Sequence, residues 1–182
     1  AGARVMAQRD VLARGRRSIA VDVKSEEGRA VVRELCRSAD GLIEGYRPGV
    51  MERLGLGPDV LLKDNPNLVY GRMTGWGQTG PYAQRAGYDF LIQAMGGLMS
   101  ITGQPDGEPG AGPMKVGVAL TDIMTGLYAT IGVLAALSHR DRTGEGQYVE
   151  AAALQRQALD VQREVLGAEH PDTLASASNL AN

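Results

Sequence analysis

Several residue types are scarce in this sequence, and each shortage disfavours a class of function. Cys36 is the only cysteine, so the chain can form no internal disulfide. His139 and His170 have no partners at metal-ligand spacing, and we predict no metal site. Aromatic residues make up only 4% of the chain, and the formal net charge is −2. We therefore predict no nucleic-acid partner, because both base stacking and a broad positive field are missing.

Targeting and cofactor signals are also scarce. The N-terminus lacks an apolar run, so we expect no signal peptide. The most apolar stretch, residues 123–137, is too short to cross a bilayer comfortably, and a buried helix is the better interpretation. Neither GxGxxG after a strand nor GxxxxGKS/T is present, so no dinucleotide or phosphate loop of these kinds is predicted. We expect no membrane contact and a location in the cytoplasm or, in a eukaryote, the mitochondrial or peroxisomal matrix.

Glycine, by contrast, is abundant. The chain has 25 glycines among 182 residues, many of them in short clusters that suit tight turns beside a ligand. With 43% hydrophobic and 22% charged residues, the composition is that of a globular domain with a sizeable core and room for a short appendage. Cys36 falls in an apolar helical pattern and is predicted to be a buried structural thiol.

The first half of the chain predicts alternating strands and helices. Three short apolar or β-branched runs are typical of strands: residues 18–23, 41–44 and 68–73. Helices are predicted between them: residues 26–39, 48–54 and 58–63. Ser25 is the expected N-cap of the first helix. Strands that alternate with helices over short connections imply a parallel sheet.

Glycine and positive charge follow the ends of the predicted strands. These ends are Lys24, residues 45–49 and residues 74–81. Ligands of open parallel sheets bind beyond the carboxyl ends of the strands, so we expect these three segments to meet at one edge. The residue types there predict a site for a polar, phosphorylated ligand.

The second half begins with a loop and continues as a long helix. Residues 102–113 are rich in glycine and proline, which predicts a surface loop or a flap near the site. Asp122 opens a helix that runs to about Ser138. Four small residues on this helix indicate close approach of another element: Gly126, Ala129, Gly132 and Ala136. Residues 148–150 are expected to be a short extended piece. From residue 151 the sequence is rich in Gln and Ala, which predicts a helical hairpin without a catalytic pattern.

Three long segments resemble one enzyme superfamily. GLIEGYRPGVMERLGLGPDVL, YGRMTGWGQTGPYAQRAGYD and MKVGVALTDIMTGLYATIGVLAALSHRDRTGEGQ are similar to class III CoA-transferases and α-methylacyl-CoA racemases. The similarity covers about residues 4–150. It implies a Rossmann-like parallel sheet, here incomplete at its N-terminus, in a protein that uses CoA and acyl-CoA as substrates and holds no permanent cofactor. It also implies a homodimer whose two subunits interlock. Residues 151–182 form a second unit and resemble one tetratricopeptide repeat of the kinesin light chain type.

The same resemblance suggests roles for individual residues. Asp122 matches the catalytic aspartate of the family. Positions that match CoA contacts, or that shape the CoA pocket, are Lys24, Tyr46, Arg47, Arg53, Arg72, Thr74, Gly75 and Gly77. Tyr88 and Asp89 match the substrate pocket. From the local sequence alone, Asp122 could equally be an ordinary N-cap, and Asp89 could simply brace the turn at Tyr88.

Three functions remain open from the sequence. The first is a CoA-transferase that moves CoA between an acyl-CoA donor and a small mono- or dicarboxylic acid through an aspartyl-CoA thioester. The second is an α-methylacyl-CoA racemase, but those enzymes carry His-Asp where this chain has Tyr88-Asp89. A phenol, with an ordinary pKa of about 10, is a poor proton shuttle at neutral pH. The third is a non-catalytic interaction protein that uses the repeat-like tail.

Overall fold

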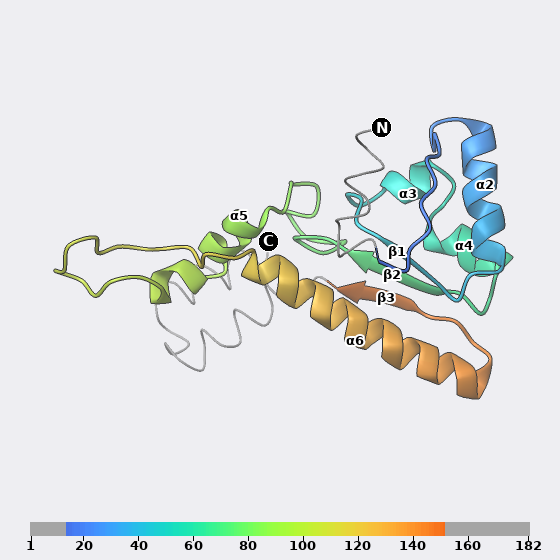
Figure 1. The fold of residues 1–182 in the computed structure, drawn as a ribbon. Coiled ribbons are helices and arrows are strands. Elements are labelled where there is room, and N and C mark those ends of the chain that lie inside the picture. The colour runs from blue at the N-terminus through green and yellow to red at the C-terminus, as the bar shows by residue number, and fades with distance from the viewer. Residues whose placement is uncertain (1–13, 152–182) are drawn as a thin grey trace.

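The structure of this chain is a computed structural model that describes residues 14–151 (Figure 1). The helical hairpin predicted for residues 151–182 lies outside the described residues apart from Ala151, and it stays a prediction. The described helices and strands are α2 (Glu26–Arg37), β1 (Gly41–Glu44), α3 (Val50–Arg53), α4 (Pro58–Asp64), β2 (Val69–Met73), α5 (Asp89–Met95), the 3-10 helix η2 (Leu98–Ile101), α6 (Leu120–Thr143) and β3 (Tyr148–Ala151).

The sheet has three parallel strands in the order β1-β2-β3. Leu42 of β1 lies opposite Tyr70 of β2, and Tyr70 in turn lies opposite Tyr148 of β3. The strands predicted at 41–44 and 68–73 are therefore confirmed, and the short extended piece after α6 is the third strand. The chain forms an α/β fold with a parallel sheet, as expected.

The strand predicted at residues 18–23 is wrong. Within residues 14–151, no backbone hydrogen bond joins this segment to β1, and Ile19 is 65% exposed. Alternation of side chains shows that a segment can lie on a half-buried surface, but a strand also needs a neighbour for its ladder bonds. The described sheet consists of β1, β2 and β3 alone, so residues 18–23 pair with none of its strands.

Helices cover the two faces of the sheet differently. The short helices α2, α3 and α4 lie on one side, and the long helix α6 lies on the other (Figure 1). Successive residues of β2 point to opposite faces of the sheet. The Tyr70 hydroxyl donates to the Leu56 carbonyl at 3.2 Å in the layer of short helices, while Gly71 faces Val133 of α6 in the other layer. The core of the first layer consists of Cys36, Met51, Leu56, Leu61, Leu68 and Tyr70. Cys36 is buried, as predicted, and burial raises the pKa of its thiol.

Helix ends follow the sequence signals closely in this first layer. The Ser25 hydroxyl accepts a hydrogen bond from the Gly28 N–H at 2.9 Å, which confirms the predicted N-cap of α2. Pro58 starts α4 at the first helical position, where its missing N–H has no partner to lose. These signals are local, so the sequence alone is enough to place them.

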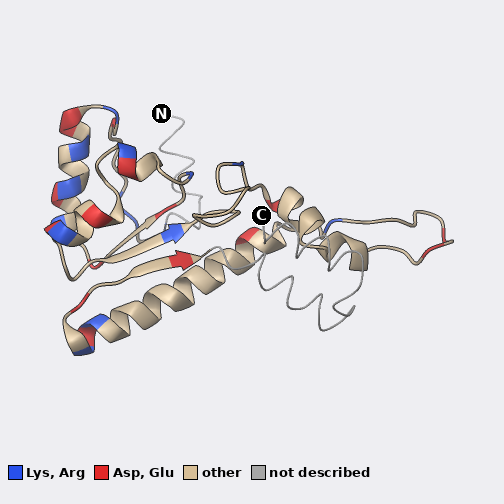
Figure 2. Cartoon of the chain, turned by 180° about the vertical axis from the view of Figure 1, so that it is seen from behind, with Lys and Arg blue, Asp and Glu red and all other residues tan. Residues whose placement is uncertain are grey.

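Helix α6 is not the buried helix that the sequence predicted. Ala129 and Ala136 are buried and Gly132 faces Val149 of β3, so the small residues do allow close approach of the sheet. The large apolar residues lie on the other side, where Ile131 is 61% exposed and Leu134 is 60% exposed. Figure 2 shows that charge is confined to the first and last turns of this helix. By length and composition alone, α6 could also cross a membrane.

The loop at residues 102–113 is a surface loop, as predicted. Its residues are almost all exposed, and a single bridge between Gln104 and Ala111 joins its two arms. The loop extends away from the sheet, beyond α5 and η2 (Figure 1). It does not reach the pocket described below, so the alternative of a flap near the site is not observed.

Candidate functional site

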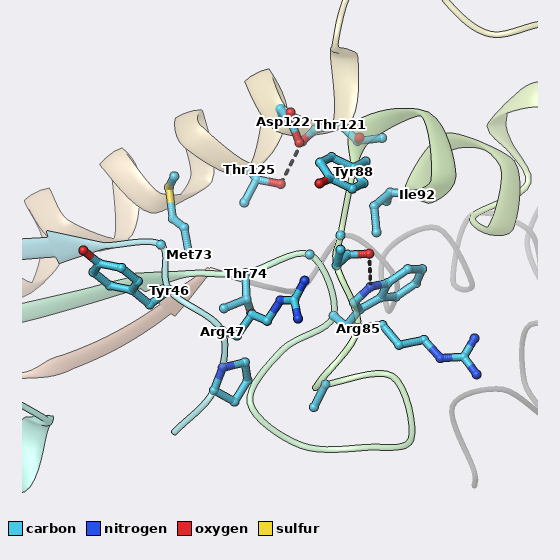
Figure 3. Close-up of a pocket in the computed structure, with 17 residues that line it drawn as sticks. Tyr46, Arg47, Met73, Thr74, Arg85, Tyr88, Ile92, Thr121, Asp122 and Thr125 are labelled. Carbon is cyan, nitrogen blue, oxygen red and sulfur yellow. Dashed lines mark hydrogen bonds between the residues drawn. The ribbon is translucent and has the colours of Figure 1, made fainter. Parts of the chain in front are cut away.

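A pocket of about 470 Å³ lies at the carboxyl ends of β1 and β2 (Figure 3). Its walls come from the loop after β1, the loop after β2, one residue of α5 and the first turns of α6. The lining residues are 45–48, 73–76, Ala83, 85–88, Ile92, Thr121, Asp122 and Thr125. Two of the three predicted strand ends therefore meet at one edge of the sheet, and the segment at Lys24 does not join them.

A buried ion pair between Arg72 of β2 and Glu44 of β1 holds the start of the loop after β1 in place. The side chains of Arg72 and Glu44 are 5% and 4% exposed, and the guanidinium bonds the Glu44 carboxylate directly. The other oxygen of Glu44 accepts a hydrogen bond from the Tyr46 N–H at 2.7 Å. Arg72 also lies 2.9 Å from Glu52 and donates to the Gln78 side chain at 2.7 Å. This network ties β2 to the loops on both sides of the pocket.

Arg72 therefore does not line the pocket, although the family resemblance suggested a role in shaping it. Its guanidinium is surrounded by protein acceptors and stacks 5.5 Å from the centre of the Tyr70 ring. Burial alone would lower the pKa of Arg72, but hydrogen bonds to Tyr70, Glu52 and Glu44 outweigh burial and raise it. Arg72 stays charged and acts on the pocket through Glu44 and Tyr46.

Two arginines border the pocket itself. Arg47 projects from the loop after β1, and Arg85 comes from the loop after β2 (Figure 3). Neither takes part in an ion pair within residues 14–151. The Arg85 guanidinium lies 4.5 Å from the centre of the Tyr82 ring, which holds its stem at the rim. The pocket thus offers the Arg47 cation to an anionic ligand, whereas the Arg85 side chain points outward (Figure 3).

The loop after β2 is closed at its neck by direct contact between two glycines. A side-chain carbon on Gly75 would overlap the backbone of Gly87, and the reverse is also true. The Trp76 indole N–H donates to the Ala86 carbonyl at 3.2 Å just beside this contact. Inside the loop, the Gly77 N–H donates to the Thr74 hydroxyl at 3.1 Å, and Gly77 has a φ of 82°. Thr74 and Gly75 line the pocket, and Gly77 does not.

Asp122 is at the far wall of the pocket, in the first turn of α6 (Figure 3). The N-cap position of this helix is Ala119, so the interpretation of Asp122 as an ordinary N-cap is wrong. The residue is exposed overall. Partial burial, and then the negative charge of Asp89, raise the pKa of the Asp122 carboxyl. A carboxylate with a raised pKa is a stronger base and nucleophile than an ordinary one.

Asp89 lies behind the pocket and does not line it. Its Oδ1 accepts hydrogen bonds from the Thr121 N–H at 2.8 Å, the Thr121 hydroxyl at 2.5 Å and the Asp122 N–H at 3.3 Å. Its Oδ2 accepts from the Gln93 amide at 2.6 Å. Burial alone would raise the pKa of Asp89, but these hydrogen bonds outweigh it and lower the pKa. Asp89 therefore braces α6 and not merely the turn at Tyr88.

The structure separates the residues suggested by the family resemblance into two groups. Those that line the pocket are Tyr46, Arg47, Thr74, Gly75, Tyr88 and Asp122. Those that do not are Lys24, Arg53, Arg72, Gly77 and Asp89. Lys24 and Arg53 are exposed outside the pocket, whereas Arg72 and Asp89 are held behind it by protein contacts. Among residues 14–151, no group of His, Cys, Asp and Glu could hold a metal ion.

Sequence reasoning missed part of the lining. Arg85 lines the pocket and lies three residues before Tyr88, in one of the segments that resemble the superfamily, but the sequence analysis gave it no role. Thr121 and Thr125 are four residues apart and flank Asp122 in the first turns of α6. Polar residues at helical spacing around a candidate nucleophile are a signal that could have been read from the sequence.

The sequence model of CoA-transferase family III matches residues 6–178 of this chain. The match continues past residue 150, where the similarity was expected to end. Succinate–glutarate CoA-transferase of Agrobacterium fabrum is 48% identical over 163 residues, which are 90% of this chain and 38% of that protein. An α/β chain with a pocket at the carboxyl ends of its parallel strands is thus matched over most of its length by one family. The chain belongs to CoA-transferase family III.

Another relative has a racemase name, and a solved structure has a similar fold. Alpha-methylacyl-CoA racemase of Mus musculus is 42% identical over 145 residues, which cover 79% of this chain and 37% of that protein. The crystal structure of a CAIB/BAIF family protein from Brucella suis matches with a TM-score of 0.76 and 45% identity. That match covers 85% of this chain and 40% of the other. The chain spans less than half the length of these relatives.

Proposed function

We propose that this protein transfers CoA from an acyl-CoA donor to a small carboxylic acid, with Asp122 as the nucleophile. The observation that carries the proposal is the position of the Asp122 carboxylate, which opens onto the same pocket as the loops after β1 and β2. In parallel sheets this edge is where nucleotide-like ligands bind. A carboxylate there can exchange acyl groups and CoA without hydrolysis, because its anhydride and thioester adducts are both labile.

The proposed reaction has four acyl transfers, each of which forms or breaks a bond to the Asp122 carboxyl group. The carboxylate attacks the thioester carbonyl of the donor, the carbon–sulfur bond breaks, and CoA leaves as a thiolate while a mixed anhydride forms. The thiolate then attacks the aspartyl carbonyl, which releases the donor acid and leaves an aspartyl-CoA thioester. The acceptor carboxylate attacks that thioester and displaces the thiolate, which forms a second mixed anhydride. The thiolate then attacks the acceptor carbonyl of this anhydride, and the bond between the acceptor and Asp122 breaks. Asp122 is regenerated, and no water or proton is consumed.

The other suggested residues take positions along the CoA molecule in this proposal. Tyr46 and Arg47 line the pocket and would contact the part of CoA nearest the thioester. Lys24 and Arg53 lie outside the pocket, and the family resemblance suggests that they contact CoA. Thr74 and Gly75 form the wall opposite Asp122. CoA is a substrate here, and we propose no permanently bound cofactor.

A small dicarboxylic acid is the acceptor that we favour. The relatives with transferase names include one named for succinate and glutarate and one named for succinyl-CoA and L-malate. In this chain, Arg47 lines the pocket and has no ion-pair partner within residues 14–151. A dicarboxylate brings one carboxylate to the reaction and leaves a second that can pair with a guanidinium.

The racemase alternative is disfavoured by the lining of the pocket. Moving an α-proton needs a base near neutral pKa, for which histidine is the usual choice. The position next to Asp89 carries Tyr88, which is 73% exposed at the pocket rim. Within residues 14–151 the only histidine is His139, near the opposite end of α6. The interaction-protein alternative rests on residues outside the described range.

A transfer assay with the complete protein tests the proposal. Succinyl-CoA is offered with a panel of mono- and dicarboxylic acids, and new acyl-CoA products are measured. We expect turnover with a dicarboxylate, and a hydroxamate on the peptide that carries Asp122 when hydroxylamine is added after the donor.

Asp122→Ala should lose turnover and the hydroxamate but keep its CoA affinity. The control Asp64→Asn changes an ion pair away from the pocket and should keep turnover, the hydroxamate and CoA affinity. Turnover near the wild-type rate in Asp122→Ala would refute the assignment.

A further inference from the structure

Helix α6 begins without a capping side chain of its own. Its N-cap residue is Ala119, which has no side-chain oxygen to accept a hydrogen bond. The first four N–H groups of any helix have no partner within the helix, and a helix end next to a pocket needs an acceptor from elsewhere. Here two of those donors, the N–H groups of Thr121 and Asp122, bond to the Asp89 carboxylate. The acceptor comes from α5, 33 residues before Asp122.

A second residue of α5 fixes the direction of that carboxylate. Gln93 is fully buried, and its amide N–H₂ donates both to Asp89 Oδ2 at 2.6 Å and to the Val118 carbonyl at 3.3 Å. Its oxygen accepts from the Val116 N–H at 2.9 Å. These partners define which end of the Gln93 amide is nitrogen and which is oxygen. Asp89 and Gln93 together hold both the segment leading into α6 and its first turn.

We propose that Asp89, oriented by Gln93, is a positioning residue that sets where the Asp122 carboxylate stands in the pocket. The proposal rests on the transferase function of Asp122 proposed above. Because one carboxylate oxygen receives the N–H groups of both Thr121 and Asp122, a change at Asp89 moves the backbone that carries the nucleophile. Thr121 is itself buried, so its side chain transmits the constraint rigidly.

Asp89 is not expected to contact the substrate. Both its oxygens are occupied by protein donors, and the residue does not line the pocket. It adds a negative charge behind Asp122, which opposes ionisation of the nucleophile. The charged or titratable groups around the pocket on the other elements are Tyr46, Arg47, Arg85 and Tyr88.

Asp89→Asn is the sharpest variant, because it keeps the size and one acceptor oxygen of the side chain. If its oxygen still caps α6, its amide N–H₂ faces the N–H₂ of Gln93, and two donors cannot bond each other. Gln93 cannot simply turn over, because Val116 and Val118 hold it in place. Asp64→Asn is the matched control, since it makes the same chemical change in the ion pair of Arg33 and Asp64 on the other side of the fold.

We expect Asp89→Asn in the complete protein to lower kcat by about 30- to 100-fold, because small misplacements of a reacting group have effects of that size. CoA affinity, measured by calorimetry, should stay within about 3-fold of wild type. The acid limb of the kcat profile should move to lower pH, because the charge that opposes ionisation of Asp122 is gone. Amide exchange at Thr121 and Asp122 should quicken, and none of these changes should appear in Asp64→Asn.

The outcomes separate this proposal from the proposed function. A wild-type protein that transfers no CoA to any acid overturns the function, and this role falls with it. A wild-type protein that transfers CoA, with an Asp89→Asn variant of unchanged kcat and unchanged amide exchange, overturns the positioning role alone. The positioning role is also overturned if the kcat and the CoA affinity of Asp89→Asn fall together, in proportion to the fraction of the variant that is unfolded.

Discussion

At the scale of single residues, Asp122 experiences two opposing electrostatic influences. The N-terminus of α6 favours a negative charge in its first turn, whereas partial burial and the carboxylate of Asp89 disfavour it. Partial burial, and then the charge of Asp89, raise the pKa of the Asp122 carboxyl. A folded-state pKa above the unfolded value means that the ionised form is less favourable in the folded protein than in the unfolded chain.

Asp122→Asn should therefore make the protein more stable at about pH 7. Below the unfolded pKa of about 3.9 both states are protonated, so wild type and variant should have similar stability there. As the pH rises through the folded pKa, the wild type loses stability and the variant does not. Urea denaturation at several pH values measures the difference. Asp64→Asn, which breaks an ion pair with Arg33, should be destabilising instead, and a destabilised Asp122→Asn would contradict the prediction.

Arg72 should contribute to stability through the carboxylate that it neutralises. Arg72→Leu leaves Glu44 buried without a counter-charge, which costs about 3–5 kcal/mol in comparable sites. Adding Glu44→Leu should recover much of that loss, because the buried charge is then gone. Arg37→Leu is the control, since its pair with Glu34 is exposed and worth less than about 1 kcal/mol. Equal losses for Arg72→Leu and Arg37→Leu in urea denaturation would count against the buried pair.

The sequence predicts local roles of residues better than roles shared across the chain. Ser25 caps the helix that follows it, and Cys36 is buried, because both properties depend on near neighbours. The local sequence allowed Asp122 to cap its own helix, yet the cap comes from Asp89. Arg72 was expected at the ligand, yet it pairs with Glu44, 28 residues earlier. Pairings over such separations become visible only once the fold brings the residues together.

At the scale of elements, the small residues of α6 differ in their surroundings. A side-chain carbon added at Gly132 would lie 2.9 Å from Val149 of β3, whereas one added at Gly126 would meet nothing within 4 Å. Both glycines are inside the same helix, where glycine is less favourable than alanine by about 1 kcal/mol. The pair therefore separates helix propensity from packing against the sheet.

Gly126→Ala should stabilise the protein by about 0.5–1 kcal/mol, because it gains helix propensity without a clash. Gly132→Ala should be less stable than Gly126→Ala by about 1–3 kcal/mol, because Val149 must move to make room. Thermal and urea unfolding of the two variants measure this gap. A Gly132→Ala variant as stable as Gly126→Ala would mean that α6 and β3 are not in close contact.

The elements that were predicted correctly are those whose patterns need no distant partner. Residues 41–44 and 68–73 are short apolar runs and form β1 and β2. Residues 18–23 have an equally good pattern but no ladder neighbour within residues 14–151. For α6, composition predicted a buried helix, whereas the sheet covers only the side with small residues. The apolar pattern predicts that the segment is a helix. How much of that helix is buried depends on which other elements pack against it.

At the scale of the whole molecule, one side of α6 forms an apolar face with little cover. Its most exposed large residues are Leu127, Ile131 and Leu134. Contiguous apolar faces of this kind are uncommon on soluble monomers. The charge-free stretch of α6 in Figure 2 corresponds to this face.

We expect the chain to bind an apolar fluorescent dye through this face. The double variant Ile131→Glu, Leu134→Glu should lower dye binding while changing the free energy of unfolding by no more than about 0.5 kcal/mol per substitution, because both positions are exposed. Ala30→Glu, which adds charge at an exposed position on α2, should leave dye binding unchanged. Strong destabilisation by the double variant would show that the two residues are covered in solution.

The contact between Gly75 and Gly87 also constrains how this chain can diverge. Each position tolerates only hydrogen, because any larger group meets the backbone of the other. A substitution at one cannot be compensated by a substitution at the second, since each new side chain adds to the same overlap. The two positions are therefore expected to stay glycine in any descendant that keeps this loop. Between them, Gly77 and Gly80 also favour glycine because their φ is positive. The other residues of the loop carry side chains already, so the loop can vary there while its neck stays unchanged.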